Sequence, residues 1–265
     1  MNRFHTLDRE IGGRRVLSGA CDTATRAGPG KDGTHDRAFA VPGLIGVCDG
    51  VSRTDQPARA ADLICMWVAA HLAEDHISLG LLSDTVQDAI DYLEKRTGSR
   101  NRTLTATTIS LAAVVAAENG ERLLLGCTIG DSPLGYITET GQISWISSPD
   151  ARHNVEAQSD DRVRSRGPLT QAMSPGTEID PNLWVAPFPA GASAIVASDG
   201  LLDVAKPTSD LLSLPSCPTA RGLCEAAAQI GSRDDIAVAL YQPDLSYAKI
   251  SAVHQPAKRR RILGR

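Results

Sequence analysis

Residues 43–50 of this chain read GLIGVCDG, an apolar run that ends in an aspartate and a glycine. The run predicts a buried β-strand, and Asp49 follows its last apolar residue directly. A buried strand that stops at a carboxylate brings that negative charge to the rim of its sheet. The stretch therefore predicts a strand of the core with a polar group at its end.

Three other apolar runs also stop or start at aspartate. Residues 122–131 read RLLLGCTIGD, residues 192–200 read ASAIVASDG, and residues 234–241 read DDIAVALY in the inverted order. If these strand ends meet, their carboxylates repel one another unless they are protonated or hold a cation. Oxygen ligands without a Cys or His cluster favour Mg²⁺ or Mn²⁺ over zinc. The pattern therefore predicts a site for hard divalent cations.

Each aspartate taken alone has a simpler explanation. Asp-Gly is a common turn pair, and Asp accepts hydrogen bonds from its own neighbouring backbone. Asp131 could close a turn, and Asp234 could cap the strand that follows it. The joint pattern favours the metal interpretation, because solubility does not explain why four apolar runs all break at aspartate.

The order of predicted elements indicates an α+β protein. Helices are predicted from apolar residues at helical spacing over 56–76, 81–97 and 221–230. Strands are predicted over 15–24, 37–41, 44–48, 104–117, 122–129, 134–138, 142–146, 183–186, 193–197 and 236–241. The four strands between residues 104 and 146 are expected to form one meander. This order predicts a central antiparallel β-sandwich flanked by helices, in α-β-β-α layers.

One folded domain is predicted over residues 15–242, after a charged lead-in over 1–14. Residues 147–181 are polar and weakly periodic, which predicts a long irregular segment. Residues 243–265 are expected to form a basic, disordered tail. Its KRRR run at 258–261 could contact an acidic partner, nucleic acid or anionic lipid, or could simply be solvated.

Composition limits the cellular setting. The chain has 265 residues, 42% of them hydrophobic, and a net charge of -4, which favours neither nucleic acid nor a membrane as main partner. Its six cysteines contain no Cys-x-x-Cys pair, which argues against a zinc cluster or a disulfide framework. The amino terminus lacks a signal-peptide core, and the apolar run at 109–117 is too short to span a bilayer. We therefore expect a soluble, monomeric, cytoplasmic protein.

Six short motifs occur in a fixed order: THD at 34–36, VCDG at 47–50, TATT at 105–108, IGDS at 129–132, ASDGLLD at 197–203 and SRDDI at 232–236. No single motif is specific. Together, in this order and with these intervals, they resemble the metal-dependent (PPM, type 2C) Ser/Thr protein phosphatases over about residues 16–241. The resemblance implies a β-sandwich flanked by helices, which agrees with the predicted elements.

The resemblance also implies a site for two Mn²⁺ or Mg²⁺ ions. Asp49 would bridge the two ions, and Gly50 would contribute its backbone carbonyl. Asp36 would serve one ion, and Asp199 and Asp234 would serve the other. The four aspartates would be the catalytic residues.

Further positions match less directly. Asp131 and Asp203 match positions that bind a third, weaker ion in some members. Lys31 stands five residues before Asp36, where the family often has a phosphate-gripping Arg, but Lys supplies charge without a bidentate fork. Arg53 could also bind phosphate. For both cations, a solvated surface position is the alternative.

The sequence departs from the family pattern at several places. His35 stands where relatives usually carry Glu or Gln, and residues 51–53 (VSR) lack the general acid that some relatives place there. Pro133 replaces the usual Arg, and Asp235 replaces an Asn. Residues 147–181 correspond to the variable flap, which is short here. These changes predict altered support of the metals and unusual substrate selection.

The resemblance implies a protein-serine/threonine phosphatase that uses a metal-activated water and forms no covalent phospho-enzyme. Its partners would be a phosphorylated protein substrate and a cognate Ser/Thr kinase pathway. Two alternatives stay open: a catalytically silent protein that keeps the fold and binds phosphoproteins or partner subunits, and a hydrolase of another phosphoester, such as a nucleotide. The cysteines are not placed as a phosphate-cradling nucleophile loop, which argues against a thiol phosphatase.

Overall fold

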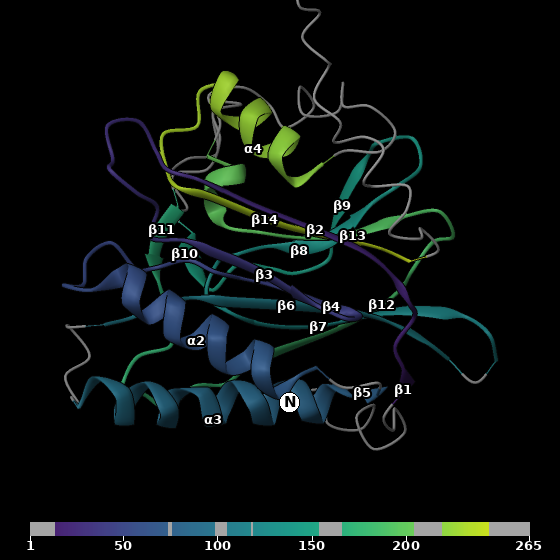
Figure 1. Cartoon of the computed structure of the whole chain (residues 1–265), viewed down its shortest axis with the longest axis horizontal. Coiled ribbons are helices and arrows are strands. Elements are labelled where there is room, and N and C mark those ends of the chain that lie inside the picture. The colour runs from purple at the N-terminus through teal and green to yellow at the C-terminus, as the bar shows by residue number, and fades with distance from the viewer. Residues whose placement is uncertain are drawn as a thin grey trace, which may run out of the picture.

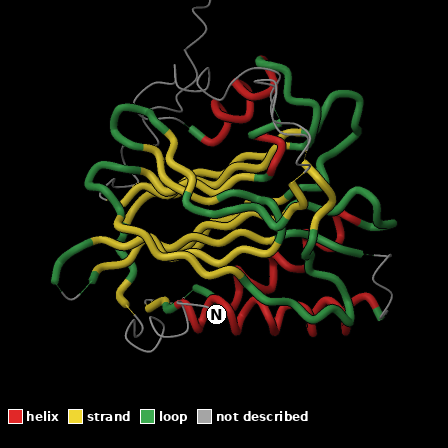
Figure 2. Tube along the Cα trace, turned by 180° about the vertical axis from the view of Figure 1, so that it is seen from behind, coloured by secondary structure: helices red, strands yellow, loops and turns green. Residues whose placement is uncertain are grey.

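The computed structural model describes residues 14–73, 76–98, 105–117, 119–153, 166–203 and 219–243. Two antiparallel sheets of five strands each lie face to face at the centre (Figure 1). Helices α2 (Pro57–His71) and α3 (Leu79–Thr97) cover the outer face of one sheet, and α4 (Ala220–Gln229) covers the other. Figure 2 shows the same four layers from behind. This arrangement confirms the predicted α+β sandwich in α-β-β-α layers.

The strand order in each sheet is not the order along the chain. The first sheet contains, in spatial order, β12 (Asn182–Pro187), β7 (Arg122–Ile129), β6 (Ile109–Ala116), β4 (Leu44–Cys48) and β3 (Arg37–Val41). The second contains β2 (Gly19–Arg26), β14 (Ile236–Pro243), β13 (Ser193–Ala197), β8 (Leu134–Ile137) and β9 (Ile143–Trp145). Neighbours in sequence pair at β3–β4, β6–β7, β8–β9 and β13–β14, whereas β4–β6, β7–β12, β8–β13 and β2–β14 join strands farther apart in the chain.

Strand β4 explains why the layers stack. All of its residues are buried, and successive side chains of a strand point to opposite faces. Leu44 and Cys48 pack in the cluster formed with α2 and α3, whereas Ile45 and Val47 pack between the two sheets. A strand with apolar neighbours on both faces needs the unbroken apolar run that its sequence shows.

The helix termini follow local chemistry. Helix α2 begins with Pro57, which fits the first turn because its missing N–H would be unpaired there. The Ser78 hydroxyl accepts a hydrogen bond from Leu81 N at 3.0 Å and caps α3, and Gly98 ends α3 with a φ of 62°. No helix within the described ranges combines the length and the apolar character that crossing a membrane requires.

Two predicted boundaries are wrong at the start of the chain. The helix predicted over 56–76 ends at His71, and His76–Ile77 instead forms strand β5, paired with β1 (Arg14–Arg15). The strand predicted over 15–24 is accordingly divided into β1 and β2. The pairing partners of these short strands lie more than fifty residues apart, so local sequence does not reveal them.

The predicted four-strand meander is also wrong. Strands β6 and β7 belong to the first sheet, whereas β8 and β9 belong to the second. The chain crosses between the sheets at Gly130, whose φ is 99°. A side chain at this position would also lie 2.6 Å from Thr108 Cγ2, so the crossing requires glycine. The crossing leaves Asp131 at the rim between the two sheets.

The segment predicted to be irregular contains regular structure. Strands β10 (Ala151–His153) and β11 (Arg166–Leu169) pair antiparallel within it. The residues between them lie outside the described ranges. The lead-in over 1–13 and nearly all of the predicted tail, residues 244–265, also lie outside the described ranges, so their predicted disorder and contacts stay predictions.

Candidate metal centre

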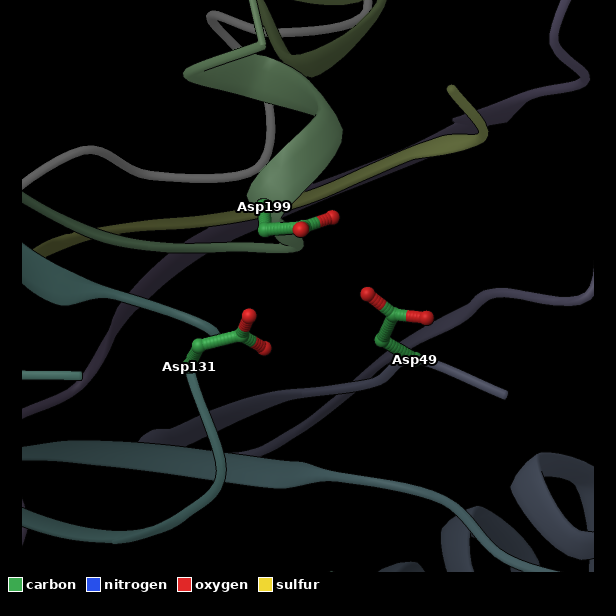
Figure 3. Close-up of side chains that lie close together, drawn as sticks. All are labelled: Asp49, Asp131 and Asp199. Carbon is green, nitrogen blue, oxygen red and sulfur yellow. The ribbon is translucent and has the colours of Figure 1, made fainter. Parts of the chain in front are cut away.

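Three aspartates meet at the rim between the two sheets. Asp49 follows β4, Asp131 follows β7, and Asp199 comes shortly after the end of β13. One carboxylate oxygen from each lies within 4.8 Å of the others. Figure 3 shows the three carboxylates directed toward a common space. We call Asp49, Asp131 and Asp199 the strand-end cluster.

Two threonines hold the backbone of Asp49. The Thr107 hydroxyl and the Thr108 amide both donate to Asp49 O, each at 2.8 Å, and Asp49 N donates to Thr108 Oγ1 at 3.1 Å. Thr108 Oγ1 also lies 2.8 Å from Ser132 Oγ, next to Asp131. Through Thr108 these contacts tie together the two strand ends that carry Asp49 and Asp131. The sequence shows the TATT motif, but only the structure shows that its last two threonines hold the Asp49 backbone.

Asp36 adds a fourth carboxylate beside the cluster. It is 1% exposed, and its Oδ2 atom has no hydrogen-bond partner. Burial raises the pKa of Asp36 to about 6, although hydrogen bonds to Ser198 and Asp49 oppose the rise. Desolvation, followed by the charges of Asp36 and Asp131, raises the pKa of Asp49 well above its usual value. A buried oxygen without a partner, among carboxylates that repel one another, fits a bound cation.

Arg37 fixes the backbone around Asp36. Its guanidinium donates to Thr34 O and to Asp36 O, each at 2.8 Å, and forms an ion pair with Asp62 on α2. The segment that carries Asp36 is therefore clamped to a helix of the outer layer. Sequence reasoning missed Arg37 and Asp62, because the helix spacing of α2 does not single out an exposed acidic residue as a partner for β3.

The glycines after Asp49 and Asp199 are needed for close packing. A Cβ at Gly50 would lie 2.7 Å from the Pro57 backbone, and a Cβ at Gly200 would lie 1.9 Å from Asp235 O. Neither glycine has a positive φ. The simple turn explanation of these Asp-Gly pairs therefore does not hold: glycine is present because another backbone approaches it.

Asp234 lies on the exposed side of the site. Its side chain is 47% exposed, and its Oδ1 atom lies 3.0 Å from Lys31 Nζ. Asp235 Oδ1 lies 3.1 Å from the same ammonium group, and its carboxylate also accepts hydrogen bonds from Gly28 N at 2.8 Å and His35 N at 2.9 Å. Lys31, Asp234 and Asp235 come from two separate segments of the chain, and we call the region in which they meet the lysine-paired loop.

Asp235 is more than a modest replacement for an amide. It is 3% exposed. Burial acts to raise its pKa, but the hydrogen bonds from Gly28 and His35 and the Lys31 ammonium together hold that pKa below its usual value. The buried carboxylate is thus kept charged by the segment that precedes Asp36. This role depends on contacts across about two hundred residues of sequence.

The remaining predicted site residues lie farther out. Arg53 and Asp203 are exposed, and neither has a side chain in the strand-end cluster. The backbone of Asp203 is linked to Asp199, since the Asp203 N–H donates to Asp199 O at 3.0 Å. Asp234 lies close enough for its charge to act on Asp49. The phosphate-binding roles of Lys31 and Arg53 and the metal role of Asp203 stay predictions.

Comparison with known proteins gives a match in fold. No protein-family model matches the chain, and curated proteins give no match in sequence. The PPM Ser-Thr phosphatase MsPP from Mycobacterium smegmatis, in complex with cacodylate, has a TM-score of 0.69 at 22% identity, over 86% of this chain and 99% of that one. The catalytic domain of the phosphatase PstP, in complex with two manganese ions, has a TM-score of 0.67 at 22% identity, over 86% and 99%.

A third similar structure is PppA, a key regulatory component of T6SS in Pseudomonas aeruginosa. Its TM-score is 0.66 at 19% identity, over 86% of this chain and 98% of that one. The chain therefore has the fold of the PPM-family Ser/Thr phosphatases, which confirms the resemblance seen in its six motifs. At these identities the likeness shows the fold, and the chemistry must be argued from the site.

Proposed function

We propose that this protein is a metal-dependent protein-serine/threonine phosphatase. The observation that carries the proposal is the strand-end cluster, in which carboxylates from three strand ends lie within 4.8 Å of one another. Their donor set is all oxygen, which suits Mn²⁺ or Mg²⁺. The similar fold of PstP, which holds two manganese ions, supports the same ions here.

We assign the ligands as the family resemblance suggests. Asp49 would bridge two ions, with Asp36 and the Gly50 carbonyl on one side and Asp199 and Asp234 on the other. Asp131 and Asp203 would hold a third, weaker ion. Bound divalent ions supply a low-pKa water and polarise a phosphoryl group, so hydrolysis needs no covalent phospho-enzyme.

The chain's own residues prepare this site. Thr107 and Thr108 hold the Asp49 backbone, and Arg37 holds the backbone of Asp36. Such anchors hold the backbone that carries these carboxylates, so little rearrangement would be needed when substrate binds. Arg53, exposed beyond Gly50, is the residue we propose to contact phosphate from the solvent side.

The wider setting follows from the proposed activity. The substrate would be a phosphorylated protein in a Ser/Thr kinase pathway, acted on by one catalytic domain over residues 15–242. We further propose that the protein works as a cytoplasmic monomer, and that the basic tail contacts an acidic partner.

The test of the proposed function is mutational. Asp49→Asn and Asp199→Asn should each lower Mn²⁺-dependent hydrolysis of a phosphoserine peptide by at least about a hundredfold, because each removes a charged ligand from the cluster. The matched control is Asp88→Asn, an exposed position on α3, which should keep full activity. Retained turnover in both cluster variants would remove the mechanism. Hydrolysis of a nucleotide but not of the phosphopeptide would instead select the other phosphoester class.

A catalytically silent protein is the second candidate, and one contact favours it. Lys31 already forms an ion pair with Asp234, a ligand that the active site would need. A calorimetric Mn²⁺ titration combined with an aryl-phosphate assay separates the two candidates. Metal binding without turnover would select the silent protein, and metal-dependent turnover would exclude it.

A further inference from the structure

The ammonium group of Lys31 is held at the edge of the proposed metal centre. Its Nζ atom lies 3.0 Å from Asp234 Oδ1 and 3.1 Å from Asp235 Oδ1, and its side chain is 32% exposed. An exposed ion pair between two flexible side chains contributes little to stability. One of these carboxylates, however, is nearly fully buried, and this makes the contact different from an ordinary surface pair.

Asp235 fixes the position of the lysine from both sides. Its carboxylate accepts hydrogen bonds from Gly28 N and His35 N, which flank Lys31 in the sequence. The segment is therefore anchored before and after Lys31 to the carboxylate that the ammonium contacts. The two backbone N–H donors and the Lys31 ammonium together compensate the buried carboxylate.

Asp234 is shared between this ion pair and the proposed metal centre. The Oδ1 atom that Lys31 contacts also accepts a hydrogen bond from Asp235 N at 2.8 Å. A divalent cation bound through this carboxylate would come close to the ammonium, and the two positive charges would repel each other. Beside the cluster, Asp36 offers a cation a buried oxygen that does not contact Lys31: the residue is 1% exposed, and its Oδ2 atom has no hydrogen-bond partner.

We infer that Lys31 is a tethered cation that competes with a divalent ion for Asp234, so that the site loads its ions in two unequal steps. The first ion binds at the strand-end cluster without displacing Lys31. The second ion, which uses Asp234, binds only when the ammonium leaves. This inference rests on the proposed function for the identity of the metal ligands.

The first experiment compares Mn²⁺ titrations of the full-length protein, without substrate, by calorimetry. In Lys31→Gln the weaker binding step should become at least about tenfold tighter, because a positive charge next to the ligand is removed. The matched control is Arg233→Gln, which removes an exposed positive charge one residue from Asp234. It should change that step by less than about threefold, since a solvated charge is screened. Thermal unfolding without metal checks that both variants fold.

The second experiment observes Lys31 in the unmodified protein. Limited acetylation followed by mass spectrometry should show that Lys31 reacts several-fold faster at saturating Mn²⁺ than without metal. Lys95, exposed at the end of α3, should react at the same rate in both conditions and serves as the internal control.

The outcomes separate this inference from the proposed function. If Lys31→Gln binds Mn²⁺ no more tightly than the wild type, or no more tightly than Arg233→Gln, the inference is overturned while the metal centre stands. Unchanged Lys31 acetylation at saturating Mn²⁺ also overturns it. If none of the three proteins binds Mn²⁺, both the inference and the metal-dependent function fail.

Discussion

The strand-end cluster and the lysine-paired loop contain the same residue type in opposite surroundings. Asp131 is buried, whereas Asp49, Asp199 and Asp234 are all half-buried, so depth alone does not separate the two regions. The cluster is held by threonine hydroxyls and strand pairing. The loop contains Lys31, whose ammonium group contacts both of its carboxylates.

The difference shows that an aspartate at a strand end does not define a metal ligand by itself. Asp49 and Asp234 both border strands that are buried in the sandwich. Desolvation and neighbouring carboxylates raise the pKa of Asp49, which means that a cation there would relieve strong repulsion. At Asp234 an ammonium group already lies within hydrogen-bond distance. The two regions should therefore respond differently to mutation, pH and metal.

The largest effect is expected where the two regions touch. Gly200→Ala would place a Cβ 1.9 Å from Asp235 O, so backbone from one region must move away from the other. We expect a loss of about 3 kcal/mol in the free energy of unfolding, measured by urea denaturation. Gly33→Ala is the control, because no atom lies within 4 Å of its added Cβ. Equal stability of the two variants would show that the close approach is not a constraint.

A second substitution tests the cluster alone. Thr108→Val keeps the shape of the side chain but leaves Asp49 N and Ser132 Oγ without their partner. The cost should be about 2 kcal/mol of stability, together with weaker Mn²⁺ binding. Denaturation and calorimetry measure the two effects. Thr23→Val, at an exposed position on β2, should change neither quantity, and an equal loss there would contradict the assigned role of Thr108.

The pH dependence sharpens the comparison through Asp36. Burial raises its pKa to about 6 in the folded, metal-free protein. Because the folded state then binds the proton more tightly than the unfolded chain, this group stabilises the metal-free fold at low pH, and the contribution is lost as pH rises through about 6.

Metal binding should have the opposite pH dependence. A proton on Asp36 competes with the cation, so Mn²⁺ affinity should fall about tenfold for each unit of pH below about 6. Calorimetry at a series of pH values measures this dependence. An affinity that stays constant from pH 7 to about 5 would exclude Asp36 from the cation site.

The smallest effect is expected for the ion pair between Arg37 and Asp62, which lies outside both regions. Asp62→Asn weakens the ion pair with Arg37, whose guanidinium also holds the backbone of Asp36. Since both partners are partly exposed, the loss of stability should be below about 1 kcal/mol. Mn²⁺ affinity should fall slightly, because Arg37 still bonds to the backbone. Asp91→Asn on α3 is the control. A large loss of Mn²⁺ affinity would mean that the Arg37–Asp62 ion pair sets the geometry of the cluster.

Local pattern was enough to predict the layers and to single out Asp49, Asp131 and Asp199, which lie together, whereas Asp234 is not part of that cluster. Apolar runs such as residues 44–48 show buried strands, and their aspartate ends were expected to meet. The resemblance to a phosphatase family, carried by six short motifs, also predicted the fold that the comparisons show. Strands and short motifs, which depend on residues close together in the chain, could therefore be predicted from the sequence.

Strand pairing and side-chain contacts between residues far apart in the chain could not be predicted from the sequence. Because the chain crosses between the sheets at Gly130, strands β8 and β9 belong to the second sheet. No local sequence pattern distinguishes such a crossing from a hairpin turn. The contacts of Asp235 with Gly28 and Lys31 span more than two hundred residues of sequence. The sequence showed that Asp235 replaced an amide, but only the structure shows that a lysine and two backbone amides surround it.

The proposed function depends on a divalent cation held by the strand-end cluster. It is tested most directly by a crystal structure grown with Mn²⁺ and an anomalous difference map recorded near the manganese edge. We expect a peak within bonding distance of carboxylate oxygens of both Asp49 and Asp199. A well-ordered cluster with no anomalous peak at saturating Mn²⁺ would contradict it.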